Sequence, residues 1–132
     1  ALFDAEKQRL PDYCHFDGRE SLKDVPTKAL IIHSRDDGTC KFENQFGELE
    51  KALSRSTRVE FLALDGKEHH PHYTKRAVKK RNEYNLALRA KRKKKELADR
   101  AALEAFAASY DWQEMTEQDM DVWNRIFEFI EK

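Results

Sequence analysis

Helix-breaking residues occupy only one part of this 132-residue chain. All four glycines and all three prolines lie before position 72. The 61 residues from His72 onward are rich in Ala, Leu, Lys, Arg and Glu, which lose little conformational entropy in a helix. The sequence therefore predicts an α+β protein with a small α+β domain over 1–73 and a helical extension over 74–132.

Short apolar runs separated by turn residues indicate a small mixed sheet in the N-terminal domain. The turn-forming residues at 35–38 follow an apolar run and predict a β-hairpin. The resulting β-β-α-β core is preceded by two less distinct elements. The expected elements are a helix at 3–9, an edge strand at 13–16, strands at 29–32 and 39–43, a helix over 46–53 and a strand at 59–64.

The helical extension is predicted to contain one long basic helix and one capped amphipathic helix. The first, over 74–109, would measure on the order of 50 Å at 1.5 Å per residue. Thr116 resembles the first residue of a capping box, which predicts a C-terminal helix over 117–131. We expect this helix to pack against the Ala-rich stretch 97–108 as a helical hairpin, or to dock on another protein.

The formal net charge of zero conceals a strongly basic segment between two acidic ones. Residues 74–95 carry 11 basic side chains and one acidic one, whereas both flanking regions have an excess of acidic side chains. Because five consecutive cations repel one another on a helix, an anionic neighbour would stabilise this segment. The candidate binding residues are Lys75, Arg76, Lys79, Lys80, Arg81, Arg89, Lys91, Arg92, Lys93, Lys94 and Lys95, with Tyr73 and Tyr84 as aromatic partners.

The sequence leaves the nature of that anionic partner open. Tyrosine and arginine side chains can stack on exposed bases, so RNA or another nucleic acid is one candidate. An acidic protein surface or anionic lipid headgroups are others, and a merely solvated helix needs no partner. A separate apolar set predicts protein binding; its members are Trp112, Met120, Trp123, Phe127 and Ile130.

No familiar catalytic motif is present: the sequence has no glycine-rich phosphate loop, GxSxG, HExxH or CxxC. The nearest alternative is a metal-dependent enzyme that uses His69, His70 and His72. Cys14, His15, His33 and Cys40 supply zinc-ligand residue types without zinc-ligand spacing. Turn propensity is sufficient to explain the acidic pair at 36–37. We therefore expect no metal and no cofactor.

These features predict a non-catalytic accessory or structural subunit that bridges the components of a larger assembly through its basic helix. The alternatives are an RNA-binding regulatory protein and, less favoured, the metal-dependent enzyme. Two cysteines are too few for a disulfide framework, which favours an intracellular location, either cytoplasmic or in an organelle matrix such as the mitochondrial one. Because the chain begins with Ala1, the removal of a presequence stays open.

Overall fold

The computed structural model describes residues 8–9, 17–24 and 26–132 and confirms the α+β class. Its elements are α2 (Gly18–Asp24), β1 (Ala29–Ser34), the π-helical turn η1 (Glu43–Gly47), α3 (Glu48–Ala52), β2 (Val59–Leu64), α4 (Lys75–Lys93), α5 (Arg100–Ala108), α6 (Trp112–Met115) and α7 (Met120–Glu131). Of the expected elements at 3–9 and 13–16, only residues 8 and 9, which are helical, lie inside the described residues.

The described part of the chain contains a two-stranded parallel sheet. β1 and β2 pair in register from Ala29 opposite Val59 to Ser34 opposite Leu64, and η1 with α3 forms the crossover between them. The predicted hairpin with a strand at 39–43 is wrong. The Asp37 carboxylate accepts hydrogen bonds from the amides of Thr39 and Cys40, so those amides cannot join a strand ladder.

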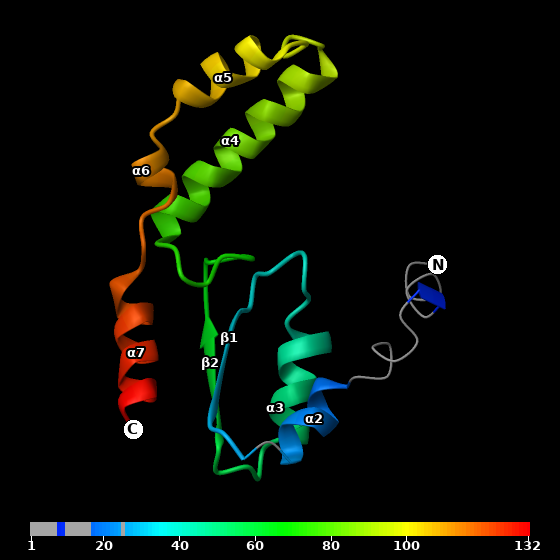
Figure 1. The fold of residues 1–132 in the computed structure, drawn as a ribbon, viewed down its shortest axis with the longest axis vertical. Coiled ribbons are helices and arrows are strands. Elements are labelled where there is room, and N and C mark those ends of the chain that lie inside the picture. The colour runs from blue at the N-terminus through cyan, green and yellow to red at the C-terminus, as the bar shows by residue number, and fades with distance from the viewer. Residues whose placement is uncertain (1–7, 10–16, 25) are drawn as a thin grey trace.

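Helices cover both faces of this sheet, with α2 and α3 on one side and α7 on the other (Figure 1). On the first face Phe46 is 1 % exposed, and its ring centroid lies 5.3 Å from that of Phe61 in β2. On the second face Arg125 of α7 forms an ion pair with Glu60 of β2. Alternate side chains of β2 therefore contact different helices, as strand geometry requires.

The single helix predicted over 74–109 is wrong, because the chain reverses after α4. Lys95 has a left-handed φ of 60°, and the chain then runs through a non-helical stretch to Asp99, which caps α5 by accepting from the Ala102 amide at 2.8 Å. Glu96 draws the Lys91 ammonium to 2.7 Å at this reversal. A helix through 91–95 would concentrate like charges, whereas the turn brings a carboxylate among them. α4 alone has 19 residues and spans about 28 Å.

The C-terminal helix exists, but its predicted start and packing partner are wrong. α7 begins at Met120 because Asp119, and not Thr116, accepts hydrogen bonds from the first free amides. The preceding residues pair instead with the segment just before α4, through an isolated antiparallel bridge between Tyr73 and Gln118. This bridge directs α7 onto the sheet, away from the predicted partner at 97–108 (Figure 1). None of the helices among the described residues is long and apolar enough to cross a bilayer.

Candidate functional site

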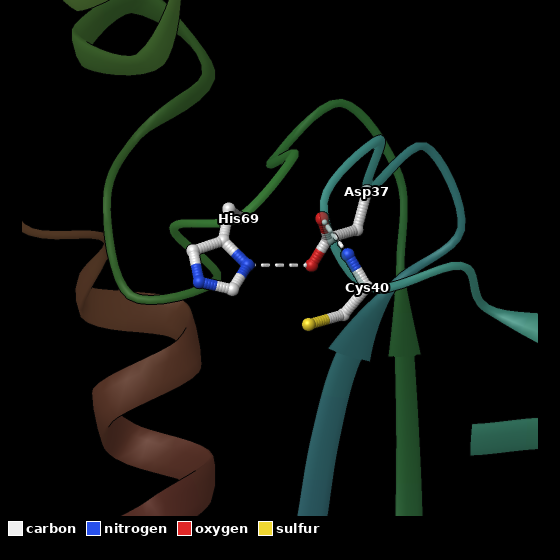
Figure 2. Close-up of side chains that lie close together, drawn as sticks. All are labelled: Asp37, Cys40 and His69. Carbon is white, nitrogen blue, oxygen red and sulfur yellow. Dashed lines mark hydrogen bonds and ion pairs between the residues drawn. The ribbon is translucent and has the colours of Figure 1, made fainter. Parts of the chain in front are cut away.

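Two polar side chains meet where the parallel strands end. Asp37 follows β1 and His69 follows β2, and the Nδ1 atom of His69 lies 2.8 Å from Oδ2 of Asp37 (Figure 2). Because Ser34 and Leu64 are paired at the last position of the register, both loops leave the same edge of the sheet. Residues that are 32 apart in sequence are therefore hydrogen-bonded partners.

Asp37 is held in an ionised and fixed state by its surroundings. Its side chain is 5 % exposed, and Oδ1 accepts hydrogen bonds from the Thr39 amide at 2.8 Å and the Cys40 amide at 2.9 Å. Burial alone would raise the pKa of Asp37, but hydrogen bonds from these two amides and from His69 outweigh it and lower that pKa below its ordinary value. The carboxylate can then only accept a hydrogen bond from His69.

The neighbouring carboxylate positions the loop that carries His69. Asp36 accepts hydrogen bonds from the Ser34 hydroxyl and, at 3.0 Å, from the Gly66 amide. The Ser34 hydrogen bond is the main reason why the pKa of Asp36 lies below its ordinary value. Gly66 has a φ of 73°, a conformation that favours glycine, and this lets the loop turn back across the end of β1.

His69 presents its other ring nitrogen away from Asp37. An ionised carboxylate at Nδ1 requires the proton on that atom, which leaves Nε2 as an unprotonated acceptor in the neutral ring. Figure 2 shows Nε2 pointing away from both Asp37 and Cys40. The His69 side chain is 54 % exposed, so its ring is in contact with solvent.

Cys40 and His33 complete the surroundings of the pair. A sulfur, a carboxylate oxygen and a ring nitrogen of Cys40, Asp37 and His69 lie within 4.8 Å of one another. His33 places Nε2 at 3.9 Å from Oδ2 of Asp37. Of the four residues considered for zinc in the sequence, His33 and Cys40 are described by the structure, and Cys14 and His15 lie outside the described residues.

The three loop histidines do not converge on one point. The ring centroids of His69 and His70 are 6.0 Å apart, and those of His70 and His72 are 6.3 Å apart, each pair meeting edge to face. Burial, followed by the nearby Arg81 cation, lowers the pKa of both His70 and His72. Of these three residues, only His69 takes part in the three-residue donor cluster described above.

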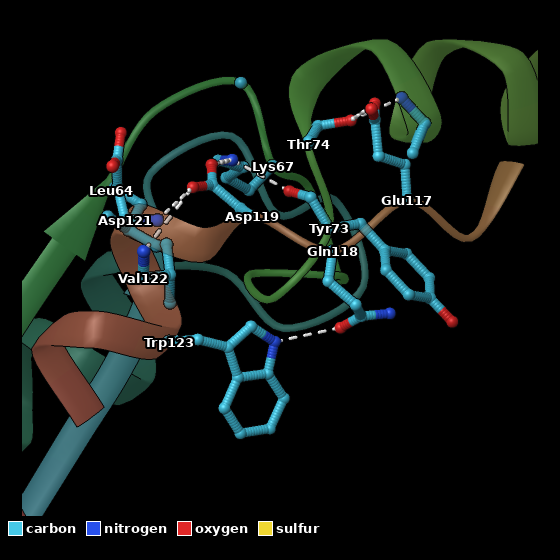
Figure 3. Close-up of polar contacts among 12 residues, drawn as sticks. Leu64, Lys67, Tyr73, Thr74, Glu117, Gln118, Asp119, Asp121, Val122 and Trp123 are labelled. Atoms are coloured by element: carbon cyan, nitrogen blue, oxygen red, sulfur yellow. Dashed lines mark hydrogen bonds and ion pairs between the residues drawn. The ribbon is translucent and has the colours of Figure 1, made fainter. Parts of the chain in front are cut away.

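A buried ion pair links the site loop to the last helix (Figure 3). Lys67 is 4 % exposed, and its ammonium donates to the Asp119 carboxylate and to the Tyr73 carbonyl. Asp119 also caps α7 through the amides of Asp121 and Val122. This one carboxylate therefore joins the β2–α4 loop to α7.

The candidate basic residues divide into paired and unpaired cations. Ion pairs join Arg76 to Glu114, Lys80 to Glu83, and Lys91 and Lys94 to Glu96, while Arg81 lies over the Tyr73 ring at 5.7 Å. Within the described residues, no ion pair is formed by Lys75, Lys79, Arg89, Arg92, Lys93 or Lys95. The unpaired cations thus include those nearest the tip of the α4–α5 hairpin.

The candidate aromatic and apolar residues also fall into two groups. Tyr84 packs inside the α4–α5 hairpin, with its ring 5.4 Å from Phe106 and 5.3 Å from Trp112. Trp123 of α7 is half-buried and donates from Nε1 to Gln118. The residues that keep a large exposed area are Trp112, Met120, Phe127 and Ile130.

No pattern in the sequence connects Asp37 with His69. Turn propensity explains Asp37, and His69 belongs to a histidine-rich loop. The usable signal was an acidic residue just after one buried strand and a histidine just after the next, a pattern that brings the two together only if the strands are parallel.

Comparisons with known proteins give no further assignment. No family model matches the chain, and no curated protein or solved structure matches it. What the chain does is therefore inferred from the geometry of its own residues.

Proposed function

We propose that Asp37 and His69 are the acid–base pair of a hydrolytic site that acts on esters or related acyl compounds. The observation that carries this proposal is the 2.8 Å hydrogen bond between His69 Nδ1 and the buried Asp37 carboxylate, at the shared carboxyl edge of two parallel strands. Ligands of open α/β sheets bind outside that edge. The proposal departs from the non-catalytic function expected from the sequence.

The chemistry follows from the two ring nitrogens. Asp37 holds the His69 proton on Nδ1, so Nε2 can take a proton from a hydroxyl or water nucleophile as its oxygen attacks the acyl carbon. Nε2 then returns the proton to the leaving alcohol or amine as the acyl bond breaks. Asp37 stays ionised throughout and stabilises the imidazolium that forms between the two steps.

The nucleophile is either water or a hydroxyl presented to the exposed side of His69 by protein outside the described residues. Among the described residues, Cys40 is the nucleophilic side chain beside the pair, and it lies away from Nε2 (Figure 2). Among the described residues the parallel sheet has two strands, which favours association with further strands, since parallel sheets are normally wider. The chain order, acid before histidine, is also that of α/β-hydrolases, in which a serine precedes both.

Replacing His69 with glutamine is expected to lower the rate of p-nitrophenyl acetate hydrolysis at pH 8 by about 10²-fold, because general-base catalysis at Nε2 is lost. His70→Gln and His72→Gln serve as matched controls, since these residues lie in the same loop and, among the described residues, form no hydrogen bond with Asp37. Equal losses in all three variants, with unchanged circular dichroism, would show that loop imidazoles hydrolyse the ester without the pair.

A second candidate is the bridging function, favoured by the exposed cations at the tip of the α4–α5 hairpin. This hairpin extends away from the sheet (Figure 1), and Arg89, Arg92, Lys93 and Lys95 form no ion pair within the described residues. We propose an acidic protein surface as the partner, because a local cluster of cations suits a local cluster of carboxylates and the acidic flanks repel a long polyanion.

Reversing these four cations to glutamate is expected to weaken the binding of a polyglutamate peptide by about 10-fold or more at low salt. Fluorescence anisotropy measures the affinity. Reversing Lys41, Lys51, Arg55 and Arg58, four exposed cations outside the hairpin, is the matched control and should change little. Tighter binding to single-stranded RNA than to the peptide would contradict the acidic-protein assignment and favour nucleic acid.

A further inference from the structure

Three donor atoms of different chemistry converge beside the acid–base pair. The Asp37 carboxylate, the Cys40 sulfur and a His69 ring nitrogen all lie within 4.8 Å of one another. Around a tetrahedral zinc ion, ligand atoms at the usual bond lengths are separated by roughly 3.3–3.7 Å. Side-chain shifts of about 1 Å would therefore bring the three atoms into a zinc coordination sphere.

The donor set selects for one class of metal. Thiolate and imidazole ligands favour zinc and related transition ions, whereas magnesium and calcium prefer oxygen donors. Two backbone amides hold the Asp37 carboxylate in place, so it is already oriented toward the other two donors. Cys40 is half-buried and carries a free thiol, so it is available to ligate as a thiolate.

His33 supplies an independent observation at the same place. Its Nδ1 atom lies 2.8 Å from the Ser34 carbonyl, which can only accept, so in the neutral ring the proton is on Nδ1 and Nε2 carries a lone pair. Nε2 is buried, has no hydrogen-bond partner among the described residues and lies 3.9 Å from the Asp37 carboxylate. Metal-binding histidines commonly donate their other nitrogen to a backbone carbonyl in this way.

The geometry points to a zinc site formed by Asp37, Cys40 and His69, with His33 as a fourth donor, and to zinc as an inhibitor of the acid–base pair. The inhibitory part rests on the proposed function. A neutral imidazole that binds zinc through Nδ1 carries its proton on Nε2. Zinc therefore displaces the Nδ1 proton, moves the ring to the opposite tautomer and removes the acceptor that hydrolysis needs. The Cys40 thiol releases its proton to solvent on binding.

Cobalt(II) is the spectroscopic probe for this site, because a thiolate ligand gives it a near-ultraviolet charge-transfer band. We expect that band in the wild-type chain and in Cys14→Ser, the matched control at the other cysteine, but not in Cys40→Ser. Zinc added in competition should remove the band. His33→Gln is expected to weaken zinc binding by about 10-fold or more.

Zinc should also inhibit p-nitrophenyl acetate hydrolysis by the wild-type chain and by Cys14→Ser, and inhibit Cys40→Ser at least about 10-fold less. A wild-type chain without the cobalt band, or a band that survives in Cys40→Ser, would overturn the site. A wild-type chain that binds cobalt through Cys40 but hydrolyses no ester would retain the metal site and overturn the proposed function.

Discussion

Replacing Asp119 with alanine is expected to lower the free energy of unfolding by about 3–5 kcal/mol, because it leaves the Lys67 ammonium buried without its counter-ion. Lys67 is 4 % exposed, and after the substitution the Tyr73 carbonyl would remain as its one hydrogen-bond partner among the described residues. The same change removes the cap of α7, which contributes about 1 kcal/mol of that loss. Urea unfolding followed by circular dichroism measures the difference.

Two further variants separate the charge from the cap. Asp119→Asn keeps an oxygen that can cap α7 and removes the negative charge. It should therefore retain the contribution of the cap, about 1 kcal/mol, and lose the contribution of the ion pair. Asp121→Ala is the control, because Asp121 is exposed in the same helical turn. A loss below about 1 kcal/mol for Asp119→Ala would contradict a structural role for the ion pair.

The ion pair between Lys67 and Asp119 also determines how the free energy of unfolding changes with pH. Burial alone would raise the pKa of Asp119, but the hydrogen bond and charge of Lys67 outweigh it and lower that pKa below its ordinary value of 3.8. A carboxyl whose pKa is lower in the folded state contributes stability above its unfolded pKa. The wild-type chain should therefore lose this contribution as the pH falls below about 4, and Asp119→Ala should show a flatter profile there.

Replacing Asp37 with asparagine is expected to reduce p-nitrophenyl acetate hydrolysis by about 10²-fold at pH 8. The asparagine amide can donate to Nδ1 of His69, which would place the ring proton on Nε2 and remove the general base. In complete serine triads the corresponding change costs about 10⁴-fold. The figure expected here is that of general-base catalysis alone, since no serine hydroxyl forms a hydrogen bond with His69 among the described residues.

Asp65→Asn is the matched control for this substitution, because Asp65 also follows a strand but is exposed and forms a surface ion pair with Arg35. It should hydrolyse the ester as fast as the wild-type chain. Thermal unfolding of both variants shows whether each is folded at the assay temperature. A folded Asp37→Asn variant with wild-type activity would remove the carboxylate from the mechanism.

The positions of helices and strands could be predicted from the sequence more readily than which of these elements pair or pack together. The strand at 59–64 follows from a local apolar run and the helix that begins after residue 74 from helix-favouring composition, and the structure has both. The pairing of 29–34 with 59–64 could not be read locally, because a parallel pair is joined by a crossover with no turn signature. The segment 39–43 is closer in sequence to the first strand and follows turn-forming residues, so it was predicted to be the pairing strand.

The contact between Asp37 and His69 could not be predicted for the same reason, because it depends on the parallel pairing of the two strands. Asp37 does form a turn, because its carboxylate accepts hydrogen bonds from the Thr39 and Cys40 amides. The prediction of a turn is therefore correct, but it accounts for only one of the carboxylate oxygens. The second contact of Asp37, to His69, depends on the register that places Ser34 opposite Leu64. No spacing rule within either loop contains that information, since the two residues approach each other only through the paired strands.

The most direct test of the acid–base pair is a long-range ¹H–¹⁵N correlation spectrum of the His69 ring, recorded on metal-free protein at pH 8. The hydrogen bond to Asp37 predicts a proton on Nδ1 and none on Nε2 in the wild-type chain, with the opposite tautomer in Asp37→Asn. A wild-type ring that carries its proton on Nε2 would contradict the pair, and with it the proposed hydrolytic site.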